Sequence, residues 1–294
     1  MPKQTLTISD EDGVVRVDKH LANVFSEYSR AALAKLFVMN LIKLNGEPIQ
    51  PGHKLRPGTT IEYDLGPLQE KPEVIALPII FEDKDVIVIN KPTGIISHAR
   101  GRFWQEASVA SFIRDRISGM DGERGGIVHR LDRATSGVMI CAKNEITLKF
   151  LQKQFSDRKV QKTYIAVVEG KPKNDVAIID APLTRDLKAP RQFKVSPDGK
   201  QSQTSYKVLK QSDKYSTLEL KPKTGRTHQL RVHLQYIGNP IVGDELYSKH
   251  EYNRLLLHAY SLEISMPDGE LKTFKADIPK EFKEIFENDN KSKD

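Results

Sequence analysis

The stretch Gly125-Gly-Ile-Val-His-Arg-Leu-Asp-Arg-Ala-Thr-Ser-Gly137 gathers glycines, small residues and ionisable groups more densely than packing requires. Ile127 and Val128 are expected to end a buried strand, and the small residues after Arg133 let the backbone approach a ligand closely. One carboxylate, Asp132, stands among guanidiniums, whose opposite charge favours its ionised form. An ionised aspartate suits nucleophilic attack better than proton donation. The pattern therefore predicts an active-site loop.

A structural ion pair is the plainest alternative for an aspartate between two arginines, because such pairs are far commoner than catalytic sites. The loop also shares a superficial pattern with the catalytic loop of protein kinases. Here, however, Leu131 separates arginine from aspartate, no Asp-Phe-Gly follows, and no glycine-rich phosphate loop precedes. A kinase is therefore excluded, and the rest of the chain decides between ion pair and active site.

Four ordered stretches of the chain resemble the motifs of the RluA-type pseudouridine synthases. They are Asn90–His98, His129–Gly137, Lys162–Gly170 and Thr224–His233, the last followed by Gly238–Asp244. The resemblance implies that a uridine already in a structured RNA is isomerised to pseudouridine; rRNA is favoured over tRNA, and the sequence does not identify the RNA or the uridine. It implies Asp132 as the nucleophile, attacking the ribose at C1′ or abstracting the 2′ proton, two routes that the sequence leaves open.

The same resemblance assigns the other site residues. Tyr164 becomes an aromatic surface for the extruded uracil, with a hydroxyl suited to proton handling, and Arg231 an ion-pair partner of Asp132. Arg231 lies on a helix expected from about Thr227 to Tyr236, capped by Thr224 or Thr227. Lys91 receives no catalytic role. The expected substrate-binding residues are His129, Arg130, Arg226, Thr227, His228 and Leu230. Arg130 is expected either to help open the RNA helix or to fill the gap left by a flipped nucleotide.

Composition bounds the class of protein. At 294 residues with 38% hydrophobic side chains, the chain is long enough for two domains. No apolar run approaches the ~18 residues of a membrane span, and the N-terminus does not read as a secretion signal, so a cytoplasmic protein is expected. We also expect it to be a monomer. The single cysteine, Cys141, lies in an apolar run and is expected to be a buried small hydrophobe.

The charge distribution favours an anionic partner. The formal net charge is +7, and the segment Glu145–Gln235 holds 19 Lys and Arg against 9 Asp and Glu, a local excess of +10. This excess lies beside the proposed nucleophile and fits RNA, although single side chains such as Lys188, Arg191 and Lys194 are equally consistent with an ordinary surface.

The N-terminal part has its own pattern. Helical spacing over Val17–Phe25, a second helix capped by Ser29, a turn in Ile42–Gly46 and a strand over Thr60–Tyr63 resemble an S4 RNA-binding domain. Residues 1–68 hold 8 basic and 8 acidic side chains, so a structural or protein-docking role stays open. The expected RNA-binding residues are Lys19, Ser29, Arg30, Lys35, Lys43 and Asn45.

The predicted architecture is therefore α+β. An S4-like domain of small α/β type (14–66) is followed by a Pro, Glu and Lys-rich linker (67–77, within a connector from Leu65 to Leu77) and a catalytic domain (78–287) with a mixed, mainly antiparallel sheet. No metal and no cofactor are expected, because no Cys-x-x-Cys, His-Glu-x-x-His or dinucleotide motif occurs. The alternative is a non-catalytic RNA-binding or ribosome-assembly factor that keeps the synthase fold.

Overall fold

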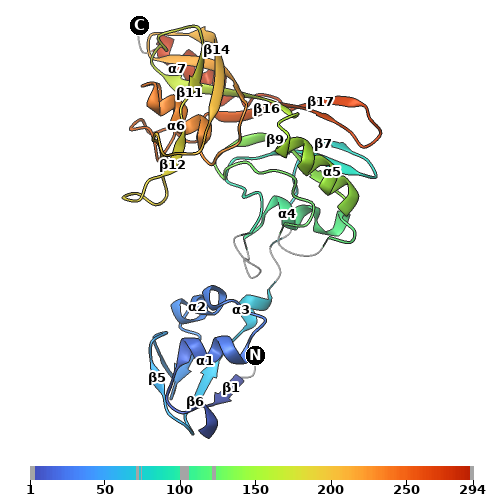
Figure 1. Ribbon diagram of the computed structural model, residues 1–294. Coiled ribbons are helices and arrows are strands. Elements are labelled where there is room, and N and C mark those ends of the chain that lie inside the picture. Colours follow the sequence, from blue (N-terminus) through green and yellow to red (C-terminus); the bar gives the residue numbers. More distant parts are fainter. Residues whose placement is uncertain (1–3, 71–72, 74, 100–105, 121–123, 292–294) are drawn as a thin grey trace. The chain divides into compact units, whose positions relative to one another are not determined.

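The computed structural model describes residues 4–70, 73, 75–99, 106–120 and 124–291 (Figure 1). Contacts divide the chain into two compact units, Met1–Val74 with Ala99–Ala107, and Ile75–His98 with Ser108–Asp294. Each unit has hydrophobic clusters of its own.

The first unit combines short strands and helices around one core that includes Leu21, Leu36 and Ile61. Its four-stranded sheet has the order β1-β6-β3-β4, and β2 pairs separately with β5. Its elements are β1 Gln4–Thr7, a 3-10 turn Asp10–Asp12, β2 Val15–Arg16, α1 Val17–Val24, α2 Arg30–Val38, β3 Ile42–Leu44, β4 Glu47–Pro48, β5 Lys54–Leu55, β6 Thr60–Tyr63 and α3 Gly66–Gln69.

Local sequence signals explain this unit, with one correction. The Ser29 hydroxyl accepts a hydrogen bond from the Ala32 amide (3.2 Å), which confirms it as the cap of α2. Asn45 and Gly46 have positive φ, as a tight hairpin between β3 and β4 demands. The expected connector from Leu65 is wrong at its start, because α3 forms there and Leu65 is buried in the core.

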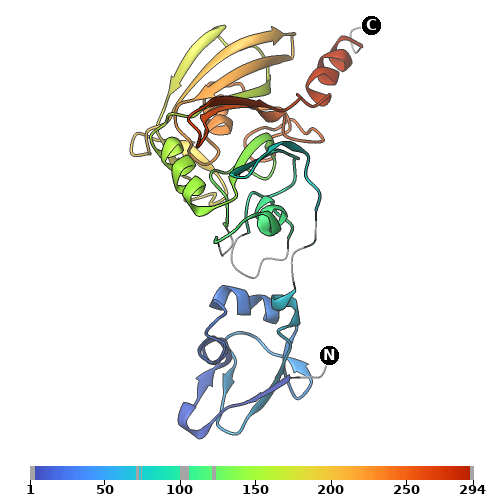
Figure 2. The same cartoon turned by 90° about the vertical axis from the view of Figure 1, so that its right-hand side faces the viewer.

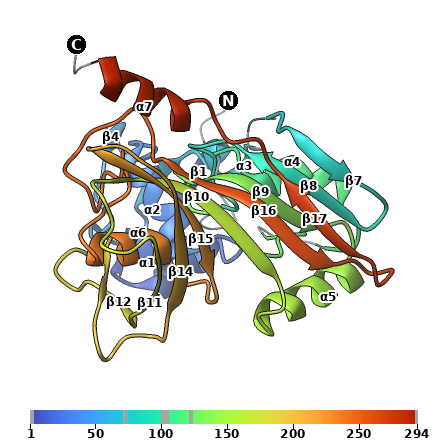
Figure 3. The same ribbon diagram turned by 90° about the horizontal axis from the view of Figure 1, so that it is seen from above.

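The second unit is built on a nine-stranded sheet with the order β11-β14-β15-β10-β16-β9-β8-β7, and β17 also pairs with β16. All of these pairings are antiparallel except that of β16 with β9, which confirms the mixed, mainly antiparallel α+β fold. The central strands run side by side (Figure 3). The strands are β7 Ile79–Glu82, β8 Val86–Lys91, β9 Ser136–Ala142, β10 Gln161–Glu169, β11 Val176–Asp180, β14 Gln203–Gln211, β15 Tyr215–Pro222, β16 Leu257–Ser265 and β17 Leu271–Lys275.

Helices cover this sheet. α5 (Glu145–Ser156) packs Leu151 into the cluster under β8 and β9 and lies against the strands (Figure 2). α6 (Gln229–Tyr236) and α7 (Glu281–Lys291) contribute Leu234 and Phe282 to the cluster formed with β10 and β15. α4 (Val109–Ile113) continues into a 3-10 turn (Arg114–Arg116), and a hairpin of β12 (Leu183–Arg185) and β13 (Phe193–Val195) projects separately.

The parallel contact between β9 and β16 requires a glycine. Gly137 has φ +117°, and a Cβ there would lie 2.2 Å from the carbonyl oxygen of Ala259. Any side chain would force the two strands apart, so this glycine fixes where the strand after the Asp132 loop begins.

Two local expectations are wrong. Ile127 and Val128 do not end a strand, because only one isolated bridge, from Ile127 to Cys141, forms there. The helix of Arg231 begins at Gln229 rather than Thr227, and no threonine caps it: the N-cap position is His228, in the left-handed conformation. The hydroxyl of Thr224 donates instead to the side-chain carbonyl of Gln229 (2.6 Å).

Candidate active site

A buried lysine anchors the backbone beside Asp132. Lys91 is fully buried at the end of β8, and its Nζ donates to the carbonyl oxygens of Pro92 (2.9 Å), Ile95 (2.7 Å) and Arg133 (3.3 Å). Burial lowers the pKa of Lys91 to about 7, against the raising influence of Asp132. Lys91 therefore ties the turn after β8 to the residue that follows Asp132.

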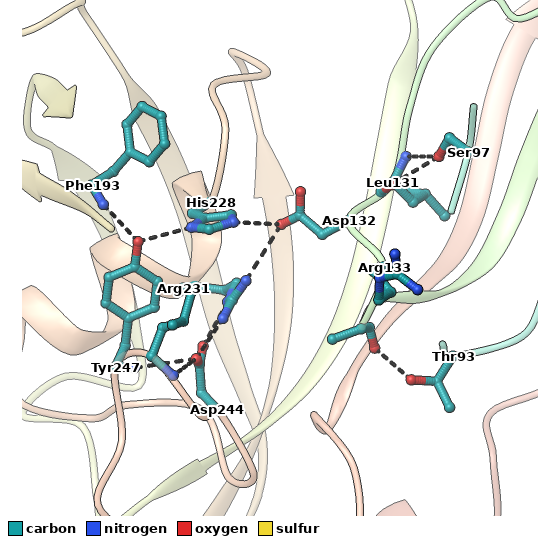
Figure 4. A network of polar contacts seen from close by, with 12 residues as sticks. Thr93, Ser97, Leu131, Asp132, Arg133, Phe193, His228, Arg231, Asp244 and Tyr247 are labelled. Atoms are coloured by element: carbon teal, nitrogen blue, oxygen red, sulfur yellow. Dashed lines mark hydrogen bonds and ion pairs between the residues drawn. The ribbon is translucent and has the colours of Figure 1, made fainter. Parts of the chain in front are cut away.

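Further hydrogen bonds hold both sides of the loop (Figure 4). The Ser97 hydroxyl donates to the carbonyl of Leu131 (2.8 Å) and accepts from its amide (3.0 Å), while the Thr93 hydroxyl donates to the carbonyl of Ala134 (2.9 Å). The backbone is thus fixed before and after Asp132, which explains why a loop can present this carboxylate in a defined direction.

Two nitrogen groups approach the carboxylate of Asp132, and both lie at the same oxygen (Figure 4). Arg231 Nη1 is 3.8 Å and His228 Nε2 is 3.9 Å from Oδ2. The ion pair expected between Arg231 and Asp132 is therefore present. Asp132 is 21% exposed, so it is accessible from the pocket while its counter-charge is buried.

Arg231 is held by a second carboxylate that the sequence analysis left without a role. Its Nε and Nη2 donate to Asp244 at 2.7 and 2.6 Å, a bidentate pair between side chains that are both buried. Burial opposes the charge of Arg231, but the hydrogen bonds to Asp244 raise its pKa above the usual value. Because Asp244 takes one edge of the guanidinium, Nη1 is directed at Asp132.

The remaining predicted residues line one pocket of about 120 Å³ in the second unit. Tyr164 lies on β10, where burial and the charge of Asp132 both raise its pKa, so its hydroxyl stays protonated at neutral pH. Leu230 is buried, whereas Arg130, Arg226 and Thr227 are exposed at the pocket. The predicted residues that the structure brings together are Arg130, Asp132, Tyr164, Arg226, Thr227, His228, Leu230 and Arg231.

His129 is the exception. Its Nε2 accepts a hydrogen bond from the Ile140 amide (3.1 Å), its ring stacks on Phe155 at 4.6 Å, and it lines a separate hollow with His98. Burial lowers the pKa of His129 to about 3, so the ring is neutral. Its position assigns it to packing beneath the loop, and the expected contact with substrate in the Asp132 pocket is not supported.

Sequence reasoning missed several residues of the site. Asp244 ends a stretch that matched the family pattern, but its spacing gave no indication of a pair with Arg231. The hydroxyl of Tyr247 forms a hydrogen bond with His228, and no sequence motif indicated that Tyr247 belongs to the site. Lys162 also lines the pocket, and burial lowers its pKa. Its residue type was visible in the sequence, and it lies two positions before Tyr164 on β10, so both side chains face the same side of the strand.

The RNA-binding candidates of the first unit are spread over several elements. Lys19 is exposed on α1, and Lys35 and Lys43 are half-buried on α2 and β3. Arg30 is 60% exposed and pairs with Asp18 at 2.7 Å. The two uncharged candidates have local structural roles, Ser29 as the cap of α2 and Asn45 in the turn after β3.

Among the described residues, no cluster of three or more His, Cys, Asp or Glu side chains is arranged to hold a metal ion. The described helices include none long and apolar enough to cross a membrane. Cys141 is buried, and burial raises the pKa of its thiol to about 12.

Known proteins resemble this chain over most of its length. A family model described as RNA pseudouridylate synthase matches residues 85–236. The chain is 38% identical to ribosomal large subunit pseudouridine synthase D of Borreliella burgdorferi, over 96% of this chain and 92% of that protein. It is 30% identical to ribosomal large subunit pseudouridine synthase C of Vibrio vulnificus, over 91% and 90%. The solved structure of human RNA pseudouridylate synthase domain containing 1 superimposes with a TM-score of 0.59 and 28% identity, over 71% of this chain and 86% of that one.

Proposed function

This chain belongs to the RNA pseudouridylate synthase family, and from that premise we propose that it isomerises specific uridines of large-subunit ribosomal RNA, with Asp132 as the nucleophile. One observation carries the assignment to Asp132. A partly exposed carboxylate on a loop held by hydrogen bonds lines the same pocket as the half-buried Tyr164, and the buried Arg231 approaches it at 3.8 Å. The relatives named for the large ribosomal subunit support the choice of RNA.

In the first step Asp132 attacks C1′ of the target ribose, so that a carbon–oxygen bond forms while the bond from C1′ to N1 of uracil breaks. Both nitrogen groups lie at Oδ2, so we assign Oδ1 as the attacking oxygen. Arg231 keeps the carboxylate ionised, since an adjacent cation favours the charged form. Asp244 keeps Arg231 in place throughout.

In the second step the detached uracil anion rotates within the pocket and rejoins C1′ through C5, releasing Asp132. Loss of the C5 proton then restores aromaticity, and N1 gains a proton, so the reaction is an isomerisation with no net change in atoms. Tyr164 supplies an aromatic surface for the detached base, and its raised pKa keeps the hydroxyl available as a hydrogen-bond donor. An alternative first step, in which Asp132 removes the 2′ proton, uses the same geometry.

We assign the wider RNA contacts to exposed basic groups. Arg130 stands at the rim of the pocket and fills the gap left by the flipped nucleotide. We propose that the first unit, from β1 through α3, is an S4-like RNA-binding domain, that the residues between α3 and Leu77 link it, and that 78–287 catalyse the reaction. We also propose that the protein works in the cytoplasm as a monomer, in a reaction that uses no metal or cofactor.

The test is conversion of unmodified RNA by the purified full-length protein. Large-subunit rRNA transcripts labelled with tritium at C5 of uridine should release the label. Sequencing of the same RNA should map the new pseudouridines to a few positions. Matched tRNA and small-subunit rRNA transcripts are the controls, and conversion of these alone would overturn the substrate. Tight binding without release from any transcript would favour the alternative, a binding or ribosome-assembly factor.

A further inference from the structure

His228 adopts a backbone conformation that side chains with a Cβ rarely take. Its φ is +56° and ψ +17°, immediately before α6 begins. Such a conformation is uncommon for a residue other than glycine, and active sites are among the places where it clusters. Here it directs the imidazole into the pocket toward Asp132, rather than letting the residue begin α6 in the ordinary way.

Two aromatic rings enclose the imidazole on its other sides (Figure 4). Phe193 lies at 5.6 Å and Tyr247 at 5.7 Å between ring centroids, both in edge-to-face geometry. The Tyr247 hydroxyl is 2.9 Å from Nδ1 of His228, which leaves Nε2 facing Asp132. The imidazole therefore connects a tyrosine on one side with the proposed nucleophile on the other.

The hydrogen bonds around Tyr247 determine which nitrogen carries the proton. The Phe193 amide donates to the tyrosine oxygen at 2.8 Å, so the hydroxyl hydrogen needs an acceptor of its own. The Nδ1 lone pair of His228 provides that acceptor and leaves the hydrogen on Nε2. The opposite tautomer would aim a nitrogen lone pair at the carboxylate of Asp132, which is repulsive.

We propose that Tyr247 fixes His228 as the Nε2–H tautomer, so that this N–H group points toward Oδ2 of Asp132 at 3.9 Å and stabilises its charge electrostatically beside Arg231. The inference rests on the proposed function of Asp132 and assigns Tyr247 as a positioning residue. Two N–H groups directed at the same oxygen favour negative charge on Oδ2 and leave Oδ1 on the open side of the carboxylate for attack. Burial lowers the pKa of His228, so this donor is neutral and weakens the nucleophile less than a second cation would.

Tyr247 also packs against Arg231, whose guanidinium lies 5.1 Å from the centre of the tyrosine ring. Tyr247→Phe keeps that ring and removes only the hydroxyl, so it separates the effect on His228 from the effect on Arg231. His228→Asn is the second variant, because asparagine tolerates the left-handed conformation and leaves Tyr247 in place. Tyr236→Phe, at an exposed tyrosine on α6, is the matched control.

Kinetics give the first readout. Loss of one donor to a charged group should lower kcat about 10-fold to 100-fold for Tyr247→Phe and for His228→Asn, with KM for RNA changed less than about twofold. Because Tyr247 acts through His228, the double variant should be no slower than His228→Asn alone. Losses that multiply in the double variant, or an unchanged kcat in both single variants, would overturn the proposal.

The second readout is the tautomer itself, measured by nitrogen NMR on full-length protein labelled at histidine, without RNA. The resonance missing from His228→Asn should show a protonated Nε2 and an unprotonated Nδ1, and should shift toward mixed tautomers in Tyr247→Phe. A proton on Nδ1 in the unaltered protein would overturn the proposal. This result does not depend on activity, so it is distinguishable from failure of Asp132 as nucleophile, which would appear as conversion by Asp132→Asn.

Discussion

The proposed active site and the N-terminal unit use charged side chains in opposite ways. In the site, Arg231 and Asp244 are 7% and 0% exposed and form two short hydrogen bonds, so each fixes the other. In the N-terminal unit, Asp18 is shared by Arg16 and Arg30, which are 46% and 60% exposed. Surface pairs of this kind contribute little stability, whereas breaking a buried pair is strongly destabilising.

The difference indicates how the two regions divide the work. Charges in the site determine geometry and should affect turnover, because a small displacement of a catalytic group has a large effect on rate. Exposed charges on the N-terminal unit and on the β12–β13 hairpin interact through solvent, and should affect affinity and its dependence on salt.

The largest effect among the supporting groups is expected for Asp244→Asn. This change removes the buried charge that orients Arg231, so the guanidinium turns and Oδ2 of Asp132 loses its defined partner. Turnover under single-turnover conditions should fall about 100-fold, with RNA affinity by gel shift nearly unchanged. Asp186→Asn, which breaks the exposed pair with Lys194, is the control. Equal losses of turnover in both variants would contradict the proposed difference between buried and exposed charges.

Lys91 provides the next test, on stability. Its pKa of about 7 in the folded protein lies below the ordinary 10.5, so between pH 7 and 10.5 the unfolded chain binds more protons and stability rises with pH. Lys91→Met removes this contribution and leaves three carbonyl oxygens without their donor. The unfolding free energy of the unaltered protein should therefore gain a few kcal/mol over Lys91→Met from pH 7 to pH 10 in urea denaturation. A difference in unfolding free energy between the two proteins that does not change with pH would contradict the lowered pKa of Lys91.

The basic hairpin is expected to have a smaller effect, confined to binding. Lys188, Arg191 and Lys194 are exposed, and replacing all three by glutamine should lower the slope of log affinity against log salt by about 2, at roughly 0.7 to 0.9 per phosphate contact. Conversion at saturating RNA should be unchanged. An unaltered slope would mean that these side chains face solvent in the complex.

The smallest effect is expected in the N-terminal unit. Its basic and acidic side chains are balanced in number. The test is a double variant of the full-length protein, Lys19→Gln with Lys43→Gln. Affinity should fall less than about threefold and the salt slope by about 1, with turnover unchanged. Changes as large as those of the hairpin triple variant would assign the main electrostatic contact to this unit instead.

Local patterns predicted most of the architecture but little of the pairing within the site. The cap at Ser29, the hairpin at Asn45 and the loop around Asp132 follow from nearby residue types, which is why the sequence indicates them. The pair of Arg231 with Asp244 depends on how distant segments pack, and no periodicity encodes it. The left-handed His228, which displaced the expected threonine cap, is held by tertiary contacts with Phe193 and Tyr247.

The orientation of the His129 ring could not be predicted from the sequence for the same reason. It stands three positions before Asp132 in the motif, and its residue type is typical of active sites, yet its ring packs under α5 against Phe155. Which side of a loop a side chain faces depends on the turns within that loop. Motif membership therefore located the site but did not assign every member to it.

The central claim is that Asp132 is the nucleophile, and Asp132→Asn tests it most directly. The change keeps the size of the side chain and removes its charge, with Asp157→Asn as an exposed control. Conversion measured by tritium release and RNA binding measured by gel shift should be followed on the same preparation. We expect conversion to fall by at least about four orders of magnitude while binding is retained or slightly strengthened. Isomerisation by Asp132→Asn at a rate near that of the unaltered protein would contradict the account.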